Sequence, residues 1–421
     1  MTAAGVAAVS PSVLVPSALA GPGADICAAS EAVSVVAVGK AAAAMDLAFR
    51  AAWPGRVVER LAIGPVAPPT WDDGEWITGG HPFATAGSAE GGRRALAVAG
   101  RVPAEGGLVL LLSGGASALM AVPAVGLTLE DKQATARTMM AAGAAITELN
   151  TVRKHLSAIK GGRLAAACAG SVVTLALSDV VGDDLSVIGS GPAVPDQTTW
   201  HDARAALAAF GGLAGHAAAV VARVEAGCAG RYADTPKADD PSMRRVRAQV
   251  IGGRRQAMAG AAAEAERRGY QPVVLDAAVV GEARYAAPAW WQTVAPRVAG
   301  RGGRLAVISS GETTVKVGGP GRGGRNQEFA LALAVPLADA GVPVMVASAG
   351  TDGVDGPTDA GGALVDSGTL ARARAAGVVE PAVALDRNDS YGFFAPLGDL
   401  WQPGPTGTNV GDLQVLLVDA P

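Results

Sequence analysis

The stretch NTVRKHLSAIKGGRLAAACAGSVVTLALSDVVGDDLSVIGSGP, from Asn150 to Pro192, combines cations, an apolar run, carboxylates and a glycine turn. Its apolar run, Val172 to Leu177, indicates a short buried strand that ends just before Asp179. In a parallel α/β sheet, ligands bind beyond the carboxyl ends of the strands, so the polar residues that follow are candidates for a site. The cations suit an anionic substrate, and Asp183 and Asp184 suit a metal ion. The alternative is a solvated cationic helix face and aspartates that cap a helix.

Short β-branched runs alternate with alanine-rich helical patterns along the rest of the chain, which predicts an α/β fold. The polar, proline-containing stretch from Arg231 to Arg244 is the best candidate for a linker. We therefore expect two domains, 1–240 and 241–421. The predicted strands are 33–38, 108–112, 172–177, 246–251, 272–275, 305–309, 313–317 and 342–347. Two predicted helices begin at Lys40 and near Ser117. Further helices are predicted at 129–148, 202–210, 256–268 and 327–337.

Composition excludes several classes of protein. Half of the 421 residues are hydrophobic, as expected of a globular protein with a large core. A formal net charge of -4 and a pI near 5.7 do not indicate the basic surface that nucleic-acid binding needs. Three scattered cysteines without metal-ligand spacing indicate small buried residues of a reduced, cytoplasmic protein: Cys27, Cys168 and Cys228.

The N-terminal stretch up to Ala24 is apolar, but it contains Pro11 and Pro16 and lacks the Lys or Arg of a signal peptide. We interpret it as a loose leader or a first helix. No apolar run approaches the roughly 20 residues of a membrane span, so we expect no membrane partner.

Four glycine-rich turns follow apolar runs, and such turns can hold phosphate or carboxylate groups. They are Gly39-Lys40, 113–117, 318–324 and 350–353. Lys40 stands where a strand meets a helix, so its ammonium could reach a phosphate; the alternative is a surface lysine.

Gly319, Gly321 and Gly324 fit the dinucleotide pattern G-x-G-x-x-G, although a single match is weak evidence. Because the loop also carries Arg322 and Arg325, a phosphate-holding loop fits better.

Further polar residues follow predicted strands or turns. Asp352 is the aspartate nearest a strand end in the loop 350–359, and it suits a metal or substrate. His81 lies in a loop between Gly80 and Pro82, where it could take part in a site. No pair of histidines has zinc spacing, and no serine-hydrolase elbow is present.

Taken in order, these motifs resemble the glycerate 2-kinases that carry a MOFRL domain, some of which are labelled hydroxypyruvate reductases. The resemblance covers most of the chain, from Val38 to Leu417, and rests on VGKAAAAM, GGHP, SGGASAL, LNTVRKHLSAIKGGRLA, SDVVGDD, SGP, GEAR, GETTVKV, GRGGRNQEFALALA, AGTDGVDGPTDAGGA, NDSYGFF and GPTGTNVGDLQVLL. It implies a Rossmann-like parallel-sheet N-terminal domain, a smaller α/β C-terminal domain, and an active site in the cleft between them.

The same resemblance implies phosphorylation of the 2-hydroxyl of D-glycerate by ATP with Mg²⁺, by a cytoplasmic enzyme that could be a homo-oligomer. It assigns catalysis to Lys40, Arg325, Asp179 and Asp352. A metal ion would be held by Asp179 and Asp183. The expected substrate- and nucleotide-binding residues are His81, Ser113, Gly114, Gly115, Ser117, Asn150, Arg153, Lys154, Gly191, Glu312, Asn326, Thr406, Thr408 and Asn409.

Two departures from the family pattern concern the substrate. The family commonly has an HPxPD-like sequence where this chain reads His81-Pro82-Phe83-Ala84-Thr85, so a carboxylate is absent. The turn Gly252-Gly253-Arg254-Arg255 also replaces a more polar one. Two alternatives stay open. One is an NAD(P)H-dependent hydroxypyruvate reductase that uses the glycine loop at Gly319. The other, which the missing carboxylate leaves open, is a binding protein that holds a hydroxy acid without turnover.

Overall fold

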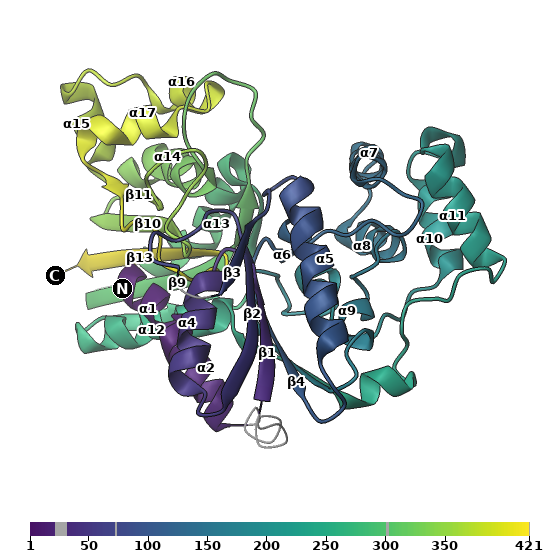
Figure 1. The fold of residues 1–421 in the computed structure, drawn as a ribbon. Coiled ribbons are helices and arrows are strands. Elements are labelled where there is room, and N and C mark those ends of the chain that lie inside the picture. Colours follow the sequence, from purple (N-terminus) through teal and green to yellow (C-terminus); the bar gives the residue numbers. More distant parts are fainter. Residues whose placement is uncertain (22–31, 72–73, 300–302, 421) are drawn as a thin grey trace. The chain divides into compact units, whose positions relative to one another are not determined.

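The computed structural model describes residues 1–21, 32–71, 74–299 and 303–420 (Figure 1). The chain forms two compact units, one made of Pro11–Leu177 and Asp183–Ile251 and the other of Met1–Ser10, Ser178–Gly182 and Gly252–Pro421. We call them the N-terminal and the C-terminal unit. The predicted linker 231–244 lies wholly within the N-terminal unit, and the predicted domain limits, 1–240 and 241–421, stay a prediction.

The N-terminal unit contains a six-stranded sheet in the order β3-β2-β1-β4-β5-β6. The pairs β3–β2, β2–β1, β1–β4 and β4–β5 are parallel, as predicted. Helices α4 and α5 cover opposite faces of this sheet (Figure 1). The strands are β1 (Ala32–Val38), β2 (Arg56–Gly64), β3 (Glu75–Thr78), β4 (Gly107–Leu112), β5 (Ser171–Leu177) and β6 (Val246–Gly252).

The helices of this unit include a cluster that packs around Met139, Leu149, Trp200 and Val224. The predicted helix 129–148 is two helices, because Gly143 takes a left-handed conformation (φ 84°) between them. The helices are α2 (Pro11–Ala20), α4 (Ala42–Ala52), α5 (Ala86–Arg101), α6 (Ala116–Leu119), α7 (Leu129–Ala141), α8 (Ile146–His155), α9 (Arg163–Ala166), α10 (Trp200–Ala209) and α11 (Ala218–Cys228).

The C-terminal unit contains a mixed seven-stranded sheet, β12-β11-β10-β13-β9-β7, with β8 also paired to β9. The strand predicted at 305–309 and the start of the one predicted at 313–317 form a single strand, β9, because the backbone continues extended through Gly311; residues 315–317 lie beyond its end. The strands are β7 (Gln271–Val274), β8 (Val279–Glu282), β9 (Gly303–Thr314), β10 (Val344–Gly350), β11 (Gly362–Asp366), β12 (Leu400–Trp401) and β13 (Asp412–Ala420).

Side chains that alternate along β9 fill two cores in this unit. Leu305 and Val307 face one core, whereas Ala306 and Ile308 face the other. Helices α13 and α14 cover the first face, and α12 covers the second (Figure 1). The helices are α1 (Thr2–Ala8), α12 (Arg254–Arg267), α13 (Ala283–Val298), α14 (Arg325–Ala338), α15 (Thr369–Ala375), α16 (Pro381–Asp386) and α17 (Ser390–Phe394).

The N-terminal segment differs from the expectation. Thr2–Ala20 has 19 residues, and an 18-residue window of it has a mean hydropathy of 1.6. By length and composition it could cross a membrane, but this is weak evidence for a span so near the N-terminus. Its two prolines do not prevent helix formation, since Pro11 starts α2 and Pro16 lies inside it. Helix α1 packs on α12 so closely that a Cβ on Gly5 would lie 2.8 Å from the carbonyl oxygen of Ala257. Residues 22–24, and Cys27, lie outside the described residues.

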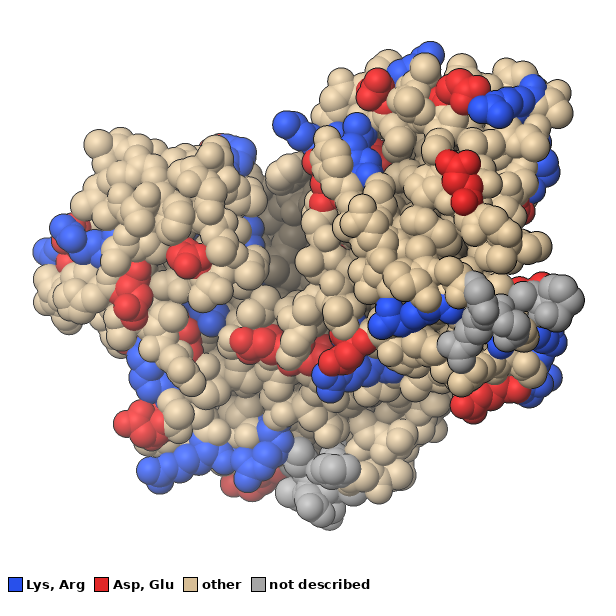
Figure 2. All heavy atoms as spheres, turned by 180° about the vertical axis from the view of Figure 1, so that it is seen from behind, with Lys and Arg blue, Asp and Glu red and all other residues tan. Residues whose placement is uncertain are grey.

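Charged side chains of both signs are interspersed on the face drawn in Figure 2, where much of the surface is uncharged. Elsewhere along the described chain, exposed ion pairs include Arg204 with Glu225 and Arg93 with Glu90.

Candidate functional site

Lys40 is held at the carboxyl end of β1 by the neighbouring strand β4. Its backbone N–H donates to the carbonyl of Gly114 at 2.9 Å. Gly39 has φ 127°, and a Cβ there would lie 2.1 Å from Ser113 Oγ, so this turn requires glycine. The buried Ser113 hydroxyl accepts from the Ala41 N–H at 3.0 Å. Ser113 therefore fixes the shape of the turn that carries Lys40.

A second group of residues, which includes the predicted Ser117 and Asn150, meets around Lys160. Lys160 Nζ donates to the carbonyl and the hydroxyl of Ser117 and to the carbonyl of Gly189, at 2.9, 3.0 and 3.1 Å. The hydroxyls of Ser117 and Ser190 lie 2.9 Å apart, and Ser190 donates to Asn150 Oδ1 at 3.2 Å. Three stretches that are far apart in the sequence thus come together, with Gly115 and Gly191 in the adjoining turns.

Helix α8 divides the cations of the opening stretch between two environments. Arg153 lines a pocket, whereas Lys154 is buried and pairs with Asp196 at 3.1 Å. Burial raises the pKa of Asp196, but the Lys154 ammonium and the Thr198 hydroxyl more than offset this, so it lies below its usual value. His155 is also buried and contacts Asp234 at 2.8 Å. The structure therefore separates Lys154 from the other predicted binding residues of this helix.

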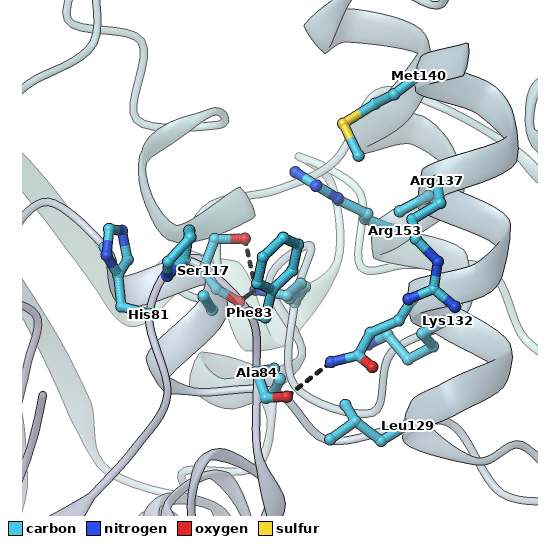
Figure 3. A pocket seen from close by; sticks show the side chains of 16 residues that line it. His81, Phe83, Ala84, Ser117, Leu129, Lys132, Arg137, Met140 and Arg153 are labelled. Carbon is cyan, nitrogen blue, oxygen red and sulfur yellow. Dashed lines mark hydrogen bonds between the residues drawn. The ribbon is translucent and has the colours of Figure 1, made fainter. Parts of the chain in front are cut away.

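The pocket beside Arg153 has a volume of about 480 Å³ and lies entirely within the N-terminal unit (Figure 3). His81 and Phe83 come from the loop after β3, and Lys132 comes from α7. The loop closes on α7 through a hydrogen bond of 2.6 Å from Gln133 Nε2 to the Ala84 carbonyl. Lys132 is absent from the sequence prediction, because it looks like any half-exposed lysine of an amphipathic helix.

Arg325, in the C-terminal unit, begins α14 and is fixed by two carboxylates. Its Nε donates to Asp412 at 2.9 Å and its Nη1 to Glu312 at 3.1 Å. Burial lowers the pKa of the guanidinium, but these carboxylates raise it above its ordinary value. Asp412 is fully buried and also accepts from Asn326 Nδ2 at 2.8 Å. The predicted trio Arg325, Glu312 and Asn326 is therefore held together.

Asp412 and Asp355 are residues that the sequence reasoning missed. Asp355 accepts the backbone N–H groups of Asn326 and Gln327 at 3.1 and 2.8 Å, which satisfies the first turn of α14. Burial raises the pKa of this carboxyl to about 6, despite those hydrogen bonds. Asp412 lies in the family-like motif GPTGTNVGDLQVLL, but a single aspartate after a glycine does not by itself indicate a role in a site.

Asp179 is joined to the C-terminal loop of the same unit. Asn409 Nδ2 donates to Asp179 Oδ2 at 3.0 Å. Thr408 donates instead to the carbonyl of Val9 at 2.6 Å, and Thr406 to that of Thr351, so these hydroxyls anchor the loop. Asp352 Oδ1 accepts from Val354 N at 3.1 Å. Asn409 and Asp179 are thus brought together.

The carboxylates proposed for a metal ion fit Mg²⁺ in their chemistry. Among the described residues, no three His, Cys, Asp or Glu side chains gather into a metal cluster. Mg²⁺ usually needs only one or two carboxylates together with substrate phosphates and water. Asp183 Oδ1 is buried and has no hydrogen-bond partner in the part of the chain that the structure describes, as expected of an oxygen that could bind a cation.

The G-x-G-x-x-G loop owes its glycines to packing. Cβ atoms on Gly319 and Gly321 would lie 2.3 Å from Arg387 O and 2.4 Å from Asp389 Cβ. Its N–H groups also have protein acceptors: Gly318 and Gly319 donate to Asn388, and Gly321 to the Arg387 carbonyl. These amides already donate hydrogen bonds within the protein, which disfavours the binding of a dinucleotide or a phosphate by this loop.

We expect Gly319→Ala to destabilise the protein by about 1–3 kcal/mol, since the new methyl group meets rigid backbone. Gly318→Ala is the matched control, because a Cβ there has nothing within 4 Å. The free energy of unfolding in urea is the measurement. Equal stabilities of the two variants would contradict a packing role.

The comparisons with known proteins agree with these motifs. The MOFRL family matches residues 305–412, and a domain of unknown function, DUF4147, matches residues 1–225. The chain is 37% identical over 399 residues to the D-glycerate 2-kinase of Thermotoga maritima, a match that covers 92% of this chain and 90% of that protein. This chain belongs to the glycerate 2-kinase family with a MOFRL domain.

Another protein that is similar to this chain carries a different name. It is a protein of Agrobacterium vitis, provisionally named a hydroxypyruvate reductase, with 41% identity over 91% of this chain and 86% of that protein. Among solved structures, the Thermotoga maritima glycerate kinase has a TM-score of 0.84 at 35% identity and covers 99% of this chain and 97% of its own. The predicted α/β fold is thereby confirmed.

Proposed function

We propose that this chain is a kinase that transfers a phosphoryl group from ATP to the 2-hydroxyl of D-glycerate and releases ADP and 2-phospho-D-glycerate. The observation that carries the proposal is the guanidinium of Arg325, fixed by Asp412 and Glu312 at the start of α14. Phosphoryl transfer depends on positioned charge more than on covalent chemistry by the protein. A cation held in place before the reaction needs no reorganisation when charge develops.

In the proposed reaction, the 2-oxygen of glycerate bonds to the γ-phosphorus while the bond from that phosphorus to the bridging oxygen of ADP breaks. Lys40 and Arg325 stabilise negative charge on the transferred group. Asp179 or Asp352 accepts the proton of the hydroxyl. Asp179 and Asp183 would hold Mg²⁺, which when bound neutralises charge on the phosphates.

The reductase alternative rests on the name of the Agrobacterium relative and on the glycine loop. The occupied amides around Gly319 count against it. The carboxylate that is missing after His81 affects which hydroxy acid is the substrate. Its absence does not remove the cations Lys40 and Arg325. A cytoplasmic location is part of the proposal, since Cys168 and Cys228 are both free thiols.

A coupled ADP-release assay tests the function with D-glycerate, L-glycerate and other hydroxy acids as substrates. We expect turnover with D-glycerate that stops on addition of EDTA and returns with excess Mg²⁺. Phosphorus NMR should place the new ester on the 2-oxygen, and a 3-phosphate product would overturn the regiochemistry. Oxidation of NADH by hydroxypyruvate without ATP would establish the reductase instead. Ligand binding with no ADP release from any acid would favour a binding protein.

A further inference from the structure

The pocket in the N-terminal unit contains an excess of positive charge. Lys132, Arg153 and Lys160 line it, and no aspartate or glutamate is among its lining residues. Two neighbouring cations outside this trio have acidic partners: Lys154 pairs with Asp196, and Arg137, which also lines the pocket, pairs with Glu130.

Within the described part of the chain, none of the three cations has a carboxylate partner. Lys160 is 2% exposed and donates only to neutral oxygens of Ser117 and Gly189. Lys132 approaches only the Val122 carbonyl, at 3.4 Å. Burial and mutual repulsion make it costly for these three basic groups to be protonated together, and a bound anion would offset that cost.

The pocket also has an apolar side and ample room. Phe83, Leu129, Ala136 and Met140 line it, and Phe83 is 66% exposed. Figure 3 shows Phe83 on the loop side and Leu129 and Met140 on the helix side. A volume of about 480 Å³ lies in the range of pockets that bind larger organic ligands. Glycerate has a single negative charge and no apolar body, so it would leave most of these groups unused.

We propose that this pocket binds a nucleoside polyphosphate, with the phosphate chain beside Lys132, Arg153 and Lys160 and the base against Phe83 and Met140. The inference rests on the proposed function, because it locates the nucleotide of that reaction. It adds two lysines, Lys132 and Lys160, and an apolar contact to the groups expected to bind substrate.

Binding to the full-length chain tests the proposal without turnover. Affinities for ATP, ADP, inorganic tripolyphosphate and D-glycerate are measured by calorimetry for the wild type, Lys132→Met and Lys160→Met. We expect each substitution to weaken ATP and tripolyphosphate about 10-fold or more, as for loss of a hydrogen bond between charged groups. Glycerate affinity should not change. Arg93→Met is the control, because Arg93 is exposed and pairs with Glu90 outside the pocket.

Phe83→Ala separates the nucleotide from a simple phosphate. It should weaken ATP and ADP and leave tripolyphosphate unchanged, since only the nucleotides have a base to contact the ring. Because Phe83 is mostly exposed, this variant should fold normally even if Lys160→Met does not.

Proton uptake gives an independent readout. Burial, with a contribution from Arg153, lowers the pKa of Lys132 to about 7. Lys160 and Arg153 face the same space, and the one carboxylate next to Lys132 in sequence, Asp131, is bound to Thr128. Phosphate beside Lys132 should raise its pKa, so ATP binding at pH 8 should take up protons. The binding enthalpy should then depend on the buffer, and less so in Lys132→Met.

Three outcomes would overturn the inference. The first is weaker glycerate binding with unchanged ATP binding, which would assign the pocket to the hydroxy acid. The second is no change in any affinity. The third is equal loss of tripolyphosphate and ATP binding in Phe83→Ala, which would exclude the base contact. A chain that binds ATP in this pocket and phosphorylates no hydroxy acid would instead refute the proposed function alone.

Discussion

Replacing Arg325 with alanine should slow glycerate phosphorylation about 10²–10³-fold, by analogy with loss of one preorganised donor in an oxyanion hole. The wild-type guanidinium is fixed by Asp412 at 2.9 Å and Glu312 at 3.1 Å. It therefore needs no reordering when charge develops on the phosphoryl group. Lys40→Ala, on the turn shaped by Gly39 and Ser113, should have an effect of similar size.

Steady-state kinetics of ADP release provide the measurement for both variants. Arg325→Lys is the informative intermediate, because an ammonium keeps the charge but cannot contact both carboxylates through separate nitrogens. Arg267→Ala is the control, since Arg267 is exposed and pairs with Glu264. If Arg325→Ala and Lys40→Ala both kept near wild-type turnover, the assignment of the two cations would be wrong.

Replacing Asp196 with alanine should destabilise the protein by about 3–5 kcal/mol, because the buried ammonium of Lys154 would lose its counter-charge. The side chains of this pair are 7% and 1% exposed. Asp196 also accepts hydrogen bonds from Thr198 and Thr235, which would lose an acceptor. Equilibrium unfolding in urea measures the effect.

Two further variants make the test specific. The pair replacement Lys154→Met with Asp196→Leu removes both charges and should recover much of the lost stability. Glu225→Ala removes one partner of an exposed pair with Arg204 and should cost no more than about 1 kcal/mol. An Asp196→Ala effect as small as that of Glu225→Ala would contradict the structural role. Loss of turnover in the folded pair variant would instead restore Lys154 to the substrate site.

The sequence allowed the strand–helix alternation to be predicted, because buried parallel strands are continuous apolar runs such as Val172 to Leu177. The predicted ends of helices and strands were wrong where the conformation of a single residue ends or continues the element. Gly143 ends α7 within a pattern that looks helical throughout, and Gly311 does not interrupt β9. These outcomes depend on tertiary packing, which a single sequence does not reveal.

The candidate site was predicted in part. Motifs identified Lys40, Arg325 and Asp179 from their places after strands or glycine turns. They could not distinguish Arg153 from Lys154, because neighbouring residues on a helix point about 100° apart and only packing decides which faces a pocket. Lys132 and Asp412 were missed for the same reason: each has an ordinary local sequence, and its surroundings come from distant parts of the chain.

The packing of α1 on α12 changes how this protein can be divided. Because Met1–Ser10 and Gly252–Pro421 belong to one unit, the whole N-terminal unit is inserted in sequence within the C-terminal one. A fragment that begins at Gly252 would lack α1 and leave Leu413 and Ala257 uncovered, so we expect it to aggregate. Met1 and Leu417 also pack against the same hydrophobic core of this unit. Cutting the chain between the two family regions would separate α1 from α12, so it is a poor route to separating the units.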